Sequence, residues 1–241
     1  MTVLSKPKIL ILDIETSPAT AYVWGLFKQN ISINQLIESS RPICFAAKWY
    51  GERGIRFHSD WTDGHDGMIR AAHELISEAD AVVGYNSDRF DLPKLQGEFL
   101  LAGLAPPPPV TGIDLLKTVK KLGLQSNKLA YVCPHLGLSA KVSHEGFSLW
   151  PKAIAGDAQA RKKMREYNLG DVELTEQLYE LIKPYIRNHP HLNETTKDEC
   201  GACGSSDTHK RGFRRTKAFK IQRIQCNSCG SWSDGVRSKV G

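Results

Sequence analysis

The 241-residue sequence contains no apolar stretch long enough to span a membrane, and its first residues do not form a signal-peptide pattern. We therefore expect no membrane contact and a cytoplasmic location. Hydrophobic residues make up 41% of the chain and charged residues 24%, as in ordinary globular proteins. The length suits one large domain, alone or with a small appendage.

Cysteine and net charge are both scarce in the first 188 residues. The only cysteines there are Cys44 and Cys133, isolated in apolar surroundings that are typical of core residues. Lys and Arg number 22 in this part against 21 Asp and Glu, whereas residues 189–241 hold ten against five. The basic tail predicts a polyanionic partner, although a solvated charged surface is the commoner cause of such a bias.

The hydrophobic pattern predicts an α/β fold with a mixed sheet of five or six strands flanked by helices, antiparallel at first and parallel later. Strands are expected at residues 9–12, 21–24, 43–50, 55–58 and 79–86, and helices within 65–78, 91–104 and 156–186. Residues 112–124 fit a short strand that runs into a helix. The polar segment 189–198 is expected to link residues 1–188 to a small separate domain, 199–241.

The first strand ends in two acids, Asp13 and Glu15, within the stretch "ILILDIETSP". Side chains two residues apart in a strand point to the same face, so these carboxylates lie side by side. Like charges that close repel each other unless a cation lies between them. A solvated strand end is the alternative, so the pair indicates a metal site only if other acids converge on it.

A second acid-bearing stretch is "VVGYNSDRFDLPKL", in which a buried strand leads into a helix that begins near Asp91. The carboxyl ends of parallel strands are where α/β sheets gather functional groups, and Asp91 lies at such an end if the two strands are neighbours. Capping the helix N-terminus is its alternative role. Asp114 lies at another strand-to-helix junction and is a rival fourth acid, which we expect to be a helix N-cap.

The third stretch is "REYNLGDVELTEQLYELI", where Tyr167 and Asp171 are four residues apart and share one helix face. Partly apolar neighbours on that face indicate that Asp171 points into the protein, where it needs a cation or hydrogen-bond donors. Glu173 and Glu176 lie on other faces, and we expect them in solvent.

In this order, the segments "DIET", "NSDRFDLPKL" and "YNLGDVELT" resemble the three motifs of the DEDD 3′→5′ exonucleases of the ribonuclease H-like superfamily. The motifs are D-x-E, N-x-x-x-F-D-x-P-x-L and Y-x-x-x-D, and the tyrosine is typical of the DEDDy branch. The segment "LWPKAIAGD" is also similar to bacterial and phage members of that branch. The resemblance covers roughly residues 8–186 and implies a ribonuclease H-like exonuclease domain in residues 1–188.

The resemblance implies a metal-dependent 3′→5′ exonuclease that hydrolyses phosphodiester bonds, with DNA favoured over RNA. Asp13, Glu15 and Asp171 would bind one Mg²⁺ or Mn²⁺, and Asp13 would bridge to a second ion with help from Asp91. Tyr167 would orient the attacking water, its alternative being a core tyrosine. Asn86 and Phe90 would help seat the 3′-terminal nucleotide, the alternatives being a turn residue and a core aromatic, and Thr16 is a further candidate for substrate binding.

The tail carries two C-x-x-C pairs separated by 22 residues: Cys200 with Cys203, and Cys226 with Cys229. In a cytoplasmic chain, two C-x-x-C pairs at this spacing are typical of a Zn²⁺ site, and disulfides or redox pairs are the alternatives. The segment resembles zinc ribbons, and Gly201 and Gly230 are expected in its knuckle turns. The basic and aromatic residues expected to contact substrate are Arg211, Phe213, Arg214, Arg215 and Lys217. Protein docking is the alternative role of the ribbon.

Three other functions are alternatives to the exonuclease. A nucleic-acid-binding protein with an inactive exonuclease domain is disfavoured because all four acids and the tyrosine are present. A transposase or resolvase on the same superfamily fold would place single acids on separate elements, and an RNA-directed exonuclease remains an alternative. The sequence contains no polymerase domain, so proofreading would require a polymerase or another replication or repair protein in trans.

Overall fold

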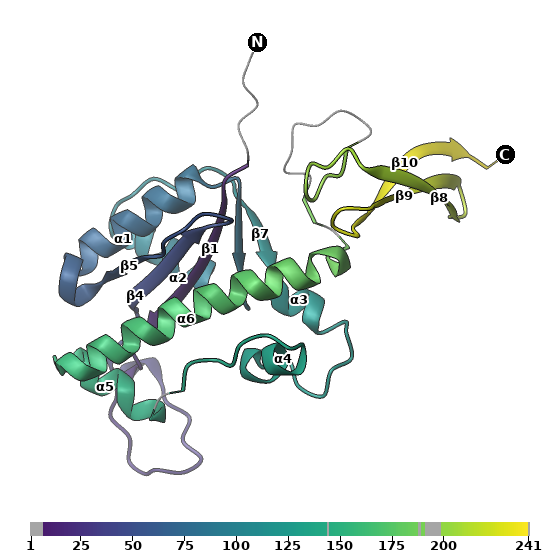
Figure 1. The fold of residues 1–241 in the computed structure, drawn as a ribbon. Coiled ribbons are helices and arrows are strands. Elements are labelled where there is room, and N and C mark those ends of the chain that lie inside the picture. Colours follow the sequence, from purple (N-terminus) through teal and green to yellow (C-terminus); the bar gives the residue numbers. More distant parts are fainter. Residues whose placement is uncertain (1–6, 144, 188, 191–198, 241) are drawn as a thin grey trace.

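The computed structural model describes residues 7–143, 145–187, 189–190 and 199–240. Its centre is a five-stranded sheet in the order β5-β4-β1-β6-β7 (Figure 1). The strands are β1 (Ile9–Thr16), β4 (Pro42–Trp49), β5 (Arg56–Ser59), β6 (Ala81–Gly84) and β7 (Thr111–Asp114). β1 pairs antiparallel with β4 and parallel with β6, which confirms a mixed sheet in which the first strand and "AVVG" are parallel neighbours.

Helices cover both faces of this sheet, which is why β1 is continuously aliphatic from Ile9 to Leu12. Leu10 and Leu12 pack with α1 (Asp60–Glu78) and α2 (Asp91–Leu101) on one face. Ile9 and Ile11 pack with α6 (Ala158–Ile182) on the other. Side chains of β1 therefore alternate between two cores. The two acids later in the strand follow the same alternation, so both point to the same face as Ile9 and Ile11.

Three short helices complete the body: α3 (Leu115–Val119), α4 (Leu129–His135) and α5 (Leu149–Ile154). The sequence pattern did not predict α4 or α5, because each is too short to show a helical period. The helix expected at 65–78 begins earlier, at Asp60, and a non-helical residue, Gly64, interrupts its first turns. No helix among the described residues combines the length and the apolarity that crossing a bilayer requires.

The strand predicted at residues 21–24 is wrong. Only Thr20–Ala21 is extended, as β2, and it pairs with β3 (Leu36–Glu38) in a small sheet of its own. Trp24 is 99% exposed, so this apolar run does not enter a core. A short apolar run predicts burial only if another element covers it, and the connection from β1 to β4 projects away from the sheet (Figure 1).

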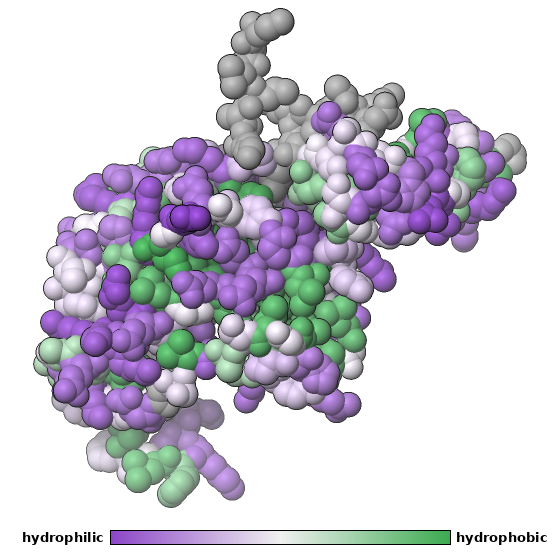
Figure 2. All heavy atoms as spheres, viewed as in Figure 1, coloured by the Kyte–Doolittle hydropathy of each residue, from purple (hydrophilic) through white to green (hydrophobic). Residues whose placement is uncertain are grey.

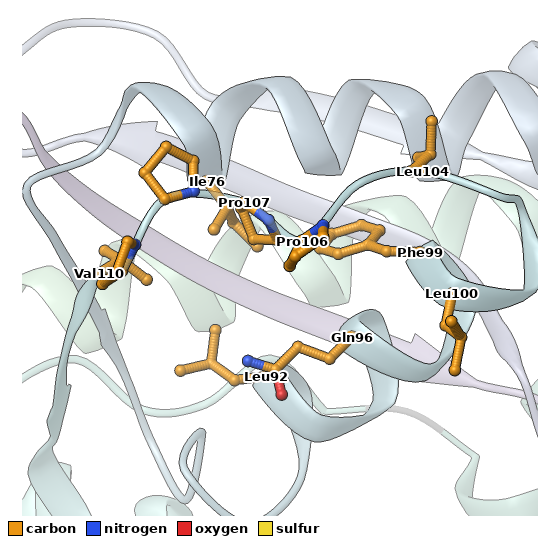
Figure 3. Close-up of a pocket in the computed structure, with 11 residues that line it drawn as sticks. Ile76, Leu92, Gln96, Phe99, Leu100, Leu104, Pro106, Pro107 and Val110 are labelled. Atoms are coloured by element: carbon orange, nitrogen blue, oxygen red, sulfur yellow. The ribbon is translucent and has the colours of Figure 1, made fainter.

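The proline-rich segment 105–110 joins α2 to β7 and borders an apolar groove of about 500 Å³ (Figure 3). Leu92 and Phe99 of α2 line this groove together with Ile76 of α1. The groove therefore lies over the face of the sheet opposite α6.

The C-terminal residues form a three-stranded antiparallel sheet that is separate from the central one, in the order β10-β9-β8 (Figure 1). Its strands are β8 (Thr208–Arg215), β9 (Phe219–Cys226) and β10 (Trp232–Lys239). Near the end of α6, Pro184 packs against the backbone of Gly230, where an added Cβ would lie 3.6 Å from the proline ring. Most of the linker expected at 189–198 lies outside the described residues.

Candidate active site and cysteine cluster

Three carboxylates converge between the end of β1 and the middle of α6. Asp13 and Glu15 continue the alternation of Ile9 and Ile11, so they face α6, and Asp171 faces them from the helix. One carboxylate oxygen from each of these acids lies within 4.8 Å of the others. Such a group can hold a divalent metal ion, because hard carboxylate oxygens are the ligands that Mg²⁺ and Mn²⁺ prefer.

The electrostatics of this group are those of buried like charges. Burial raises the pKa of Asp13 well above its ordinary value, and the nearby Asp91, Glu15 and Asp171 raise it further. Burial and Asp171 likewise raise the pKa of Glu15 to about 7. A bound cation would relieve this repulsion and restore the ionised forms.

Asp91 lies beside the three acids but outside the 4.8 Å group. It is the first residue of α2 and is only 3% exposed, while Phe90 occupies the N-cap position. Its Oδ1 accepts a hydrogen bond from the backbone N–H of Ile14, at 3.0 Å, which ties α2 to β1. Burial raises the pKa of Asp91 to about 7. The alternative role as an N-cap is therefore wrong.

Asp114 is the helix N-cap that the sequence predicted. Its Oδ1 accepts the backbone N–H of Leu116 at 3.0 Å and that of Asn86 at 2.8 Å. The second bond anchors Asn86 in a left-handed conformation with φ of 66°. Asp114 does not belong to the carboxylate group.

Tyr167 lies one helical turn before Asp171 and is 7% exposed, as the shared face predicts. Its ring meets Trp150 edge to face, with centroids 6.1 Å apart. Burial raises the pKa of the Tyr167 hydroxyl to about 12, so this group is a neutral hydrogen-bond donor near the carboxylates. The other residues implied to seat a nucleotide are partly or well exposed: Thr16 at the end of β1, Asn86 after β6, and Phe90 at 39%.

Sequence reasoning missed Lys141. Its Nζ lies 2.8 Å from Oδ2 of Asp171 and 4.6 Å from the centre of the Tyr167 ring. Gly170 makes this approach possible, because a Cβ there would lie 2.7 Å from Cγ2 of Val142. Lys141 belongs to a segment without regular structure, and nothing in its spacing indicates this contact.

Two further missed residues hold the acids on β1. Asn168 donates from Nδ2 to Oδ2 of Asp13 at 2.7 Å and to the Asp13 backbone carbonyl at 3.1 Å. Trp150 donates from Nε1 to Oε2 of Glu15 at 3.1 Å. Both lie inside segments on which the family resemblance rests, "YNLGD" and "LWPK". The sequence therefore indicated that these segments matter, but it did not predict which acids the two side chains contact.

The expectation that Glu176 lies in solvent is wrong. Its carboxylate pairs with Lys48 of β4 and accepts the backbone N–H of Gly51 at 3.0 Å. The turn after β4 passes over α6 at this point, which no helical period can indicate. Glu173 is exposed, as predicted.

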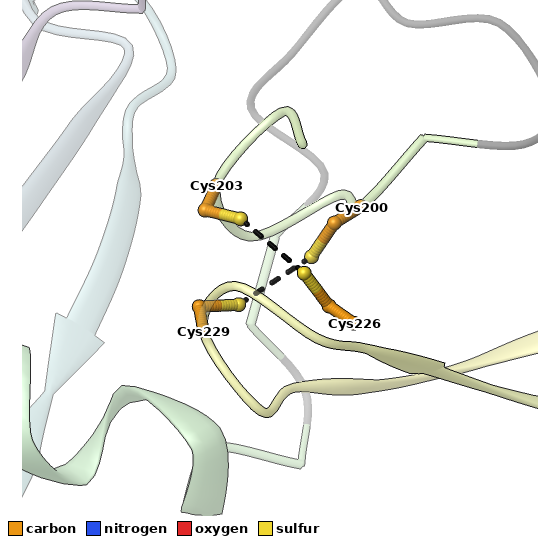
Figure 4. A group of neighbouring side chains, drawn as sticks. All are labelled: Cys200, Cys203, Cys226 and Cys229. Carbon is orange, nitrogen blue, oxygen red and sulfur yellow. Dashed lines mark hydrogen bonds between the residues drawn. The ribbon is translucent and has the colours of Figure 1, made fainter. Parts of the chain in front are cut away.

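The four tail cysteines form a second group that can hold a metal (Figure 4). Sγ–Sγ distances are 3.6 Å for Cys200 and Cys229, and 3.7 Å for Cys203 and Cys226. A disulfide would require about 2.05 Å. Four thiolates around Zn²⁺, each about 2.3 Å from the metal, would be about 3.8 Å apart. The cluster therefore fits a structural Zn²⁺ site rather than disulfides.

The two C-x-x-C turns have the same geometry. Gly204 donates its backbone N–H to Cys200 at 2.7 Å, and Gly230 donates to Cys226 at 3.0 Å. Both glycines have positive φ, 75° and 76°, which a side chain would disfavour. The knuckle glycine of the first pair is therefore Gly204, not Gly201 as predicted.

The tail residues expected to contact substrate do not meet the carboxylates, because they lie on the separate sheet. Arg211, Phe213, Arg215 and Lys217 are exposed along β8 and the turn after it. Arg214 is different, since its Nε donates to Oδ1 of Asp234 at 2.9 Å and its Nη2 donates to the other carboxylate oxygen.

A sequence model of the RNase H superfamily matches residues 10–183 of this chain. The matched part includes the three acids, Asp91 and Tyr167, and it ends before the cysteine cluster. No curated protein matches the chain.

Proposed function

The chain belongs to the RNase H superfamily, and from that premise we propose that it is a metal-dependent 3′→5′ exonuclease. Domains of this superfamily are generally nucleases that act on nucleic acid. The observation that supports a metal-dependent exonuclease in particular is the convergence of Asp13, Glu15 and Asp171 within 4.8 Å, beside the buried Tyr167. The exonuclease domain is assigned to residues 1–188, the linker to 189–198 and the zinc ribbon to 199–241.

The residues present fit a pair of Mg²⁺ or Mn²⁺ ions. Asp13, Glu15 and Asp171 would hold the first, and Asp13 and Asp91 the second. Burial and the repulsion by neighbouring acids, which together raise the pKa of Asp13, support this assignment, as does a set of ligand atoms that consists of oxygens alone. Ions bound there would stabilise charge on the attacking and leaving oxygens of an in-line displacement at phosphorus.

The surrounding residues orient the reacting groups. The Tyr167 hydroxyl donates a hydrogen bond that positions the attacking water, while Trp150 and Asn168 hold the carboxylates of Glu15 and Asp13. Lys141 neutralises part of the negative charge until substrate and metal arrive. Thr16, Asn86 and Phe90 would seat the 3′-terminal nucleotide.

The ribbon would hold the nucleic acid through exposed basic and aromatic side chains, with DNA favoured. Zn²⁺ on the four cysteines would supply the folding energy of this small sheet. A cytoplasmic site of action, in a bacterium or a phage-infected cell, suits thiolate ligands that must stay reduced. Any role in proofreading would involve a polymerase or another repair protein in trans.

The test is digestion of DNA and RNA labelled at the 5′ or the 3′ end, with Mg²⁺, Mn²⁺ or EDTA. We expect metal-dependent release of 3′-terminal mononucleotides, and more from DNA than from RNA. Release from the 5′ end would contradict the proposed direction. Binding without cleavage under all conditions would favour the inactive nucleic-acid-binding alternative, and faster digestion of RNA would favour the RNA-directed one.

A further inference from the structure

The connection from β1 to β4 carries the most exposed apolar side chains of the described chain. We call residues 20–38 the aromatic loop. It begins shortly after Glu15, and pairing of β2 with β3 closes its base. Figure 1 shows it projecting below α5, and Figure 2 shows hydrophobic surface on the same projection.

The exposure of this loop is extreme for apolar residues. Its most exposed members are Trp24 at 99%, Ile33 at 88%, Leu26 at 86%, Phe27 at 84% and Tyr22 at 75%. Single exposed apolar residues are common on protein surfaces and need no explanation. A cluster of this kind on one projection marks an interaction surface.

The base of the loop lies only a few residues from the carboxylate site along the chain. Thr20 follows Glu15 by five positions, and five residue-to-residue steps span at most about 18 Å. The loop base also borders a groove of about 890 Å³ that Pro151 and Ile154 of α5 line from the other side. Trp150, on the same helix, donates to Glu15. α5 therefore contacts Glu15 through Trp150 and lines the groove beside the loop with the next residue, Pro151.

Little of the carboxylate site reaches the surface. Asp91 and Asp171 are each 3% exposed and Tyr167 is 7% exposed. We expect a single strand to approach such buried groups more readily than a duplex does. A duplex end would then have to open before its 3′ strand enters the site.

We propose that the aromatic loop is a wedge that unstacks the last base pairs of a duplex and delivers its free 3′ strand to the acids. This inference rests on the proposed function and names its substrate class, paired nucleic-acid ends. Three aromatic rings, on Tyr22, Trp24 and Phe27, offer flat faces on which any base can stack. Leu26 and Ile33 are the kind of apolar side chain that proteins insert between base steps.

The charge of the loop favours bases over other occupants. Lys28 and Glu38 are its only charged residues, so it offers almost nothing to phosphates or to an anionic membrane surface. The contacts it can make are with uncharged flat groups, and base faces next to the carboxylate site are such groups. A second copy of the chain is the other possible occupant, and the experiment distinguishes it.

The first test compares Trp24→Ala/Phe27→Ala with wild type on a single-stranded oligonucleotide and on the same strand in a blunt duplex. We expect the duplex rate to fall about tenfold or more, while the single-strand rate changes less than about twofold. The matched control is Leu100→Ala/Leu101→Ala, which removes residues exposed by 79% and 81% on α2 and should change neither rate. An unchanged ratio of the two rates, or equal losses on both substrates, overturns the wedge.

The second test does not depend on cleavage. In an Asp13→Ala background, the fluorescence of a 2-aminopurine at the 3′ end of the duplex should increase when the protein binds. The loop substitutions should abolish this increase in fluorescence. If wild type fails to cleave but the loop-dependent increase in fluorescence remains, the exonuclease proposal is wrong and the wedge proposal is supported. If the rise is absent, or if light scattering shows that the loop substitutions convert a dimer to a monomer, the loop is not a wedge.

Discussion

The ammonium group of Lys141 lies 2.8 Å from Oδ2 of Asp171, the acid that α6 contributes to the three clustered carboxylates. Burial lowers the pKa of Lys141, but Asp171 and Tyr167 outweigh burial and raise it above the ordinary value. Lys141 thus stays charged and neutralises part of the negative charge that a bound divalent metal ion would also neutralise.

Lys141→Met should destabilise the metal-free protein, because it removes the ammonium group that pairs with the buried carboxylate of Asp171. We expect a loss of about 1–3 kcal/mol, or a melting temperature lower by about 3 °C or more in EDTA. Mg²⁺ should then raise the melting temperature more than in wild type. The control is Lys152→Met, on α5, whose ammonium is 3.6 Å from Glu145 at the surface. Equal metal-induced shifts in Lys141→Met and wild type would contradict this role.

Asp13→Ala or Asp171→Ala should abolish cleavage while the fold remains intact, because each removes a carboxylate from the 4.8 Å group. Asp157→Ala is the control, since Asp157 is an acid that caps α6 by accepting the backbone N–H of Ala160 and is not one of the clustered carboxylates. It should cost about 1 kcal/mol of stability and retain activity. Calorimetric titration with Mn²⁺ should show lost binding only in the first two variants; Mn²⁺ binding unchanged by Asp13→Ala would remove this acid from the site.

Tyr167→Phe should slow the chemical step on the order of 10²-fold and leave residual activity, because it removes one positioning hydrogen bond. Single-turnover kinetics isolates that step from product release. The aromatic packing against Trp150 survives the substitution, so the melting temperature should hardly change. A wild-type single-turnover rate would show that the hydroxyl has no part in the reaction.

The metal-free protein should lose stability as the pH rises from about 4 to about 7. Burial raises the pKa of Glu15 from 4.5 to about 7 and that of Asp91 from 3.8 to about 7, so the folded state binds protons that the unfolded chain has already released. The free energy of unfolding therefore falls as pH increases through this window. Melting temperatures measured in EDTA across this range should show a smaller decline for Asp91→Asn. A decline as steep as that of wild type would refute the elevated pKa of Asp91.

Arg211→Ala/Lys217→Ala should weaken DNA binding and reduce the slope of log affinity against log salt by about 1.8, because two phosphate contacts are lost. Arg214→Ala should change the slope less, since Asp234 already neutralises this guanidinium. Binding is measured in the Asp13→Ala background to prevent cleavage. Cys226→Ser should reproduce the effect by unfolding the ribbon. Identical slopes in all variants would favour a protein-docking ribbon.

Local periodicity was enough to predict much of the fold and site. β1 and α6 each show their period within one segment, so the shared face of Asp13 and Glu15, and that of Tyr167 and Asp171, follow from spacing alone. The two C-x-x-C pairs likewise indicated four converging thiols, and the structure brings them together. These features depend on residues close together in the chain.

Only the tertiary structure decided what lies against those residues. Trp150 meets Glu15 across 135 positions and Asn168 meets Asp13 across 155, and no local pattern encodes such contacts. The contact of Lys141 with Asp171 depends on the absence of a side chain at Gly170. The apolar run that includes Trp24 looks buried in sequence and is exposed in the fold, because burial is a property of what surrounds a segment rather than of its composition.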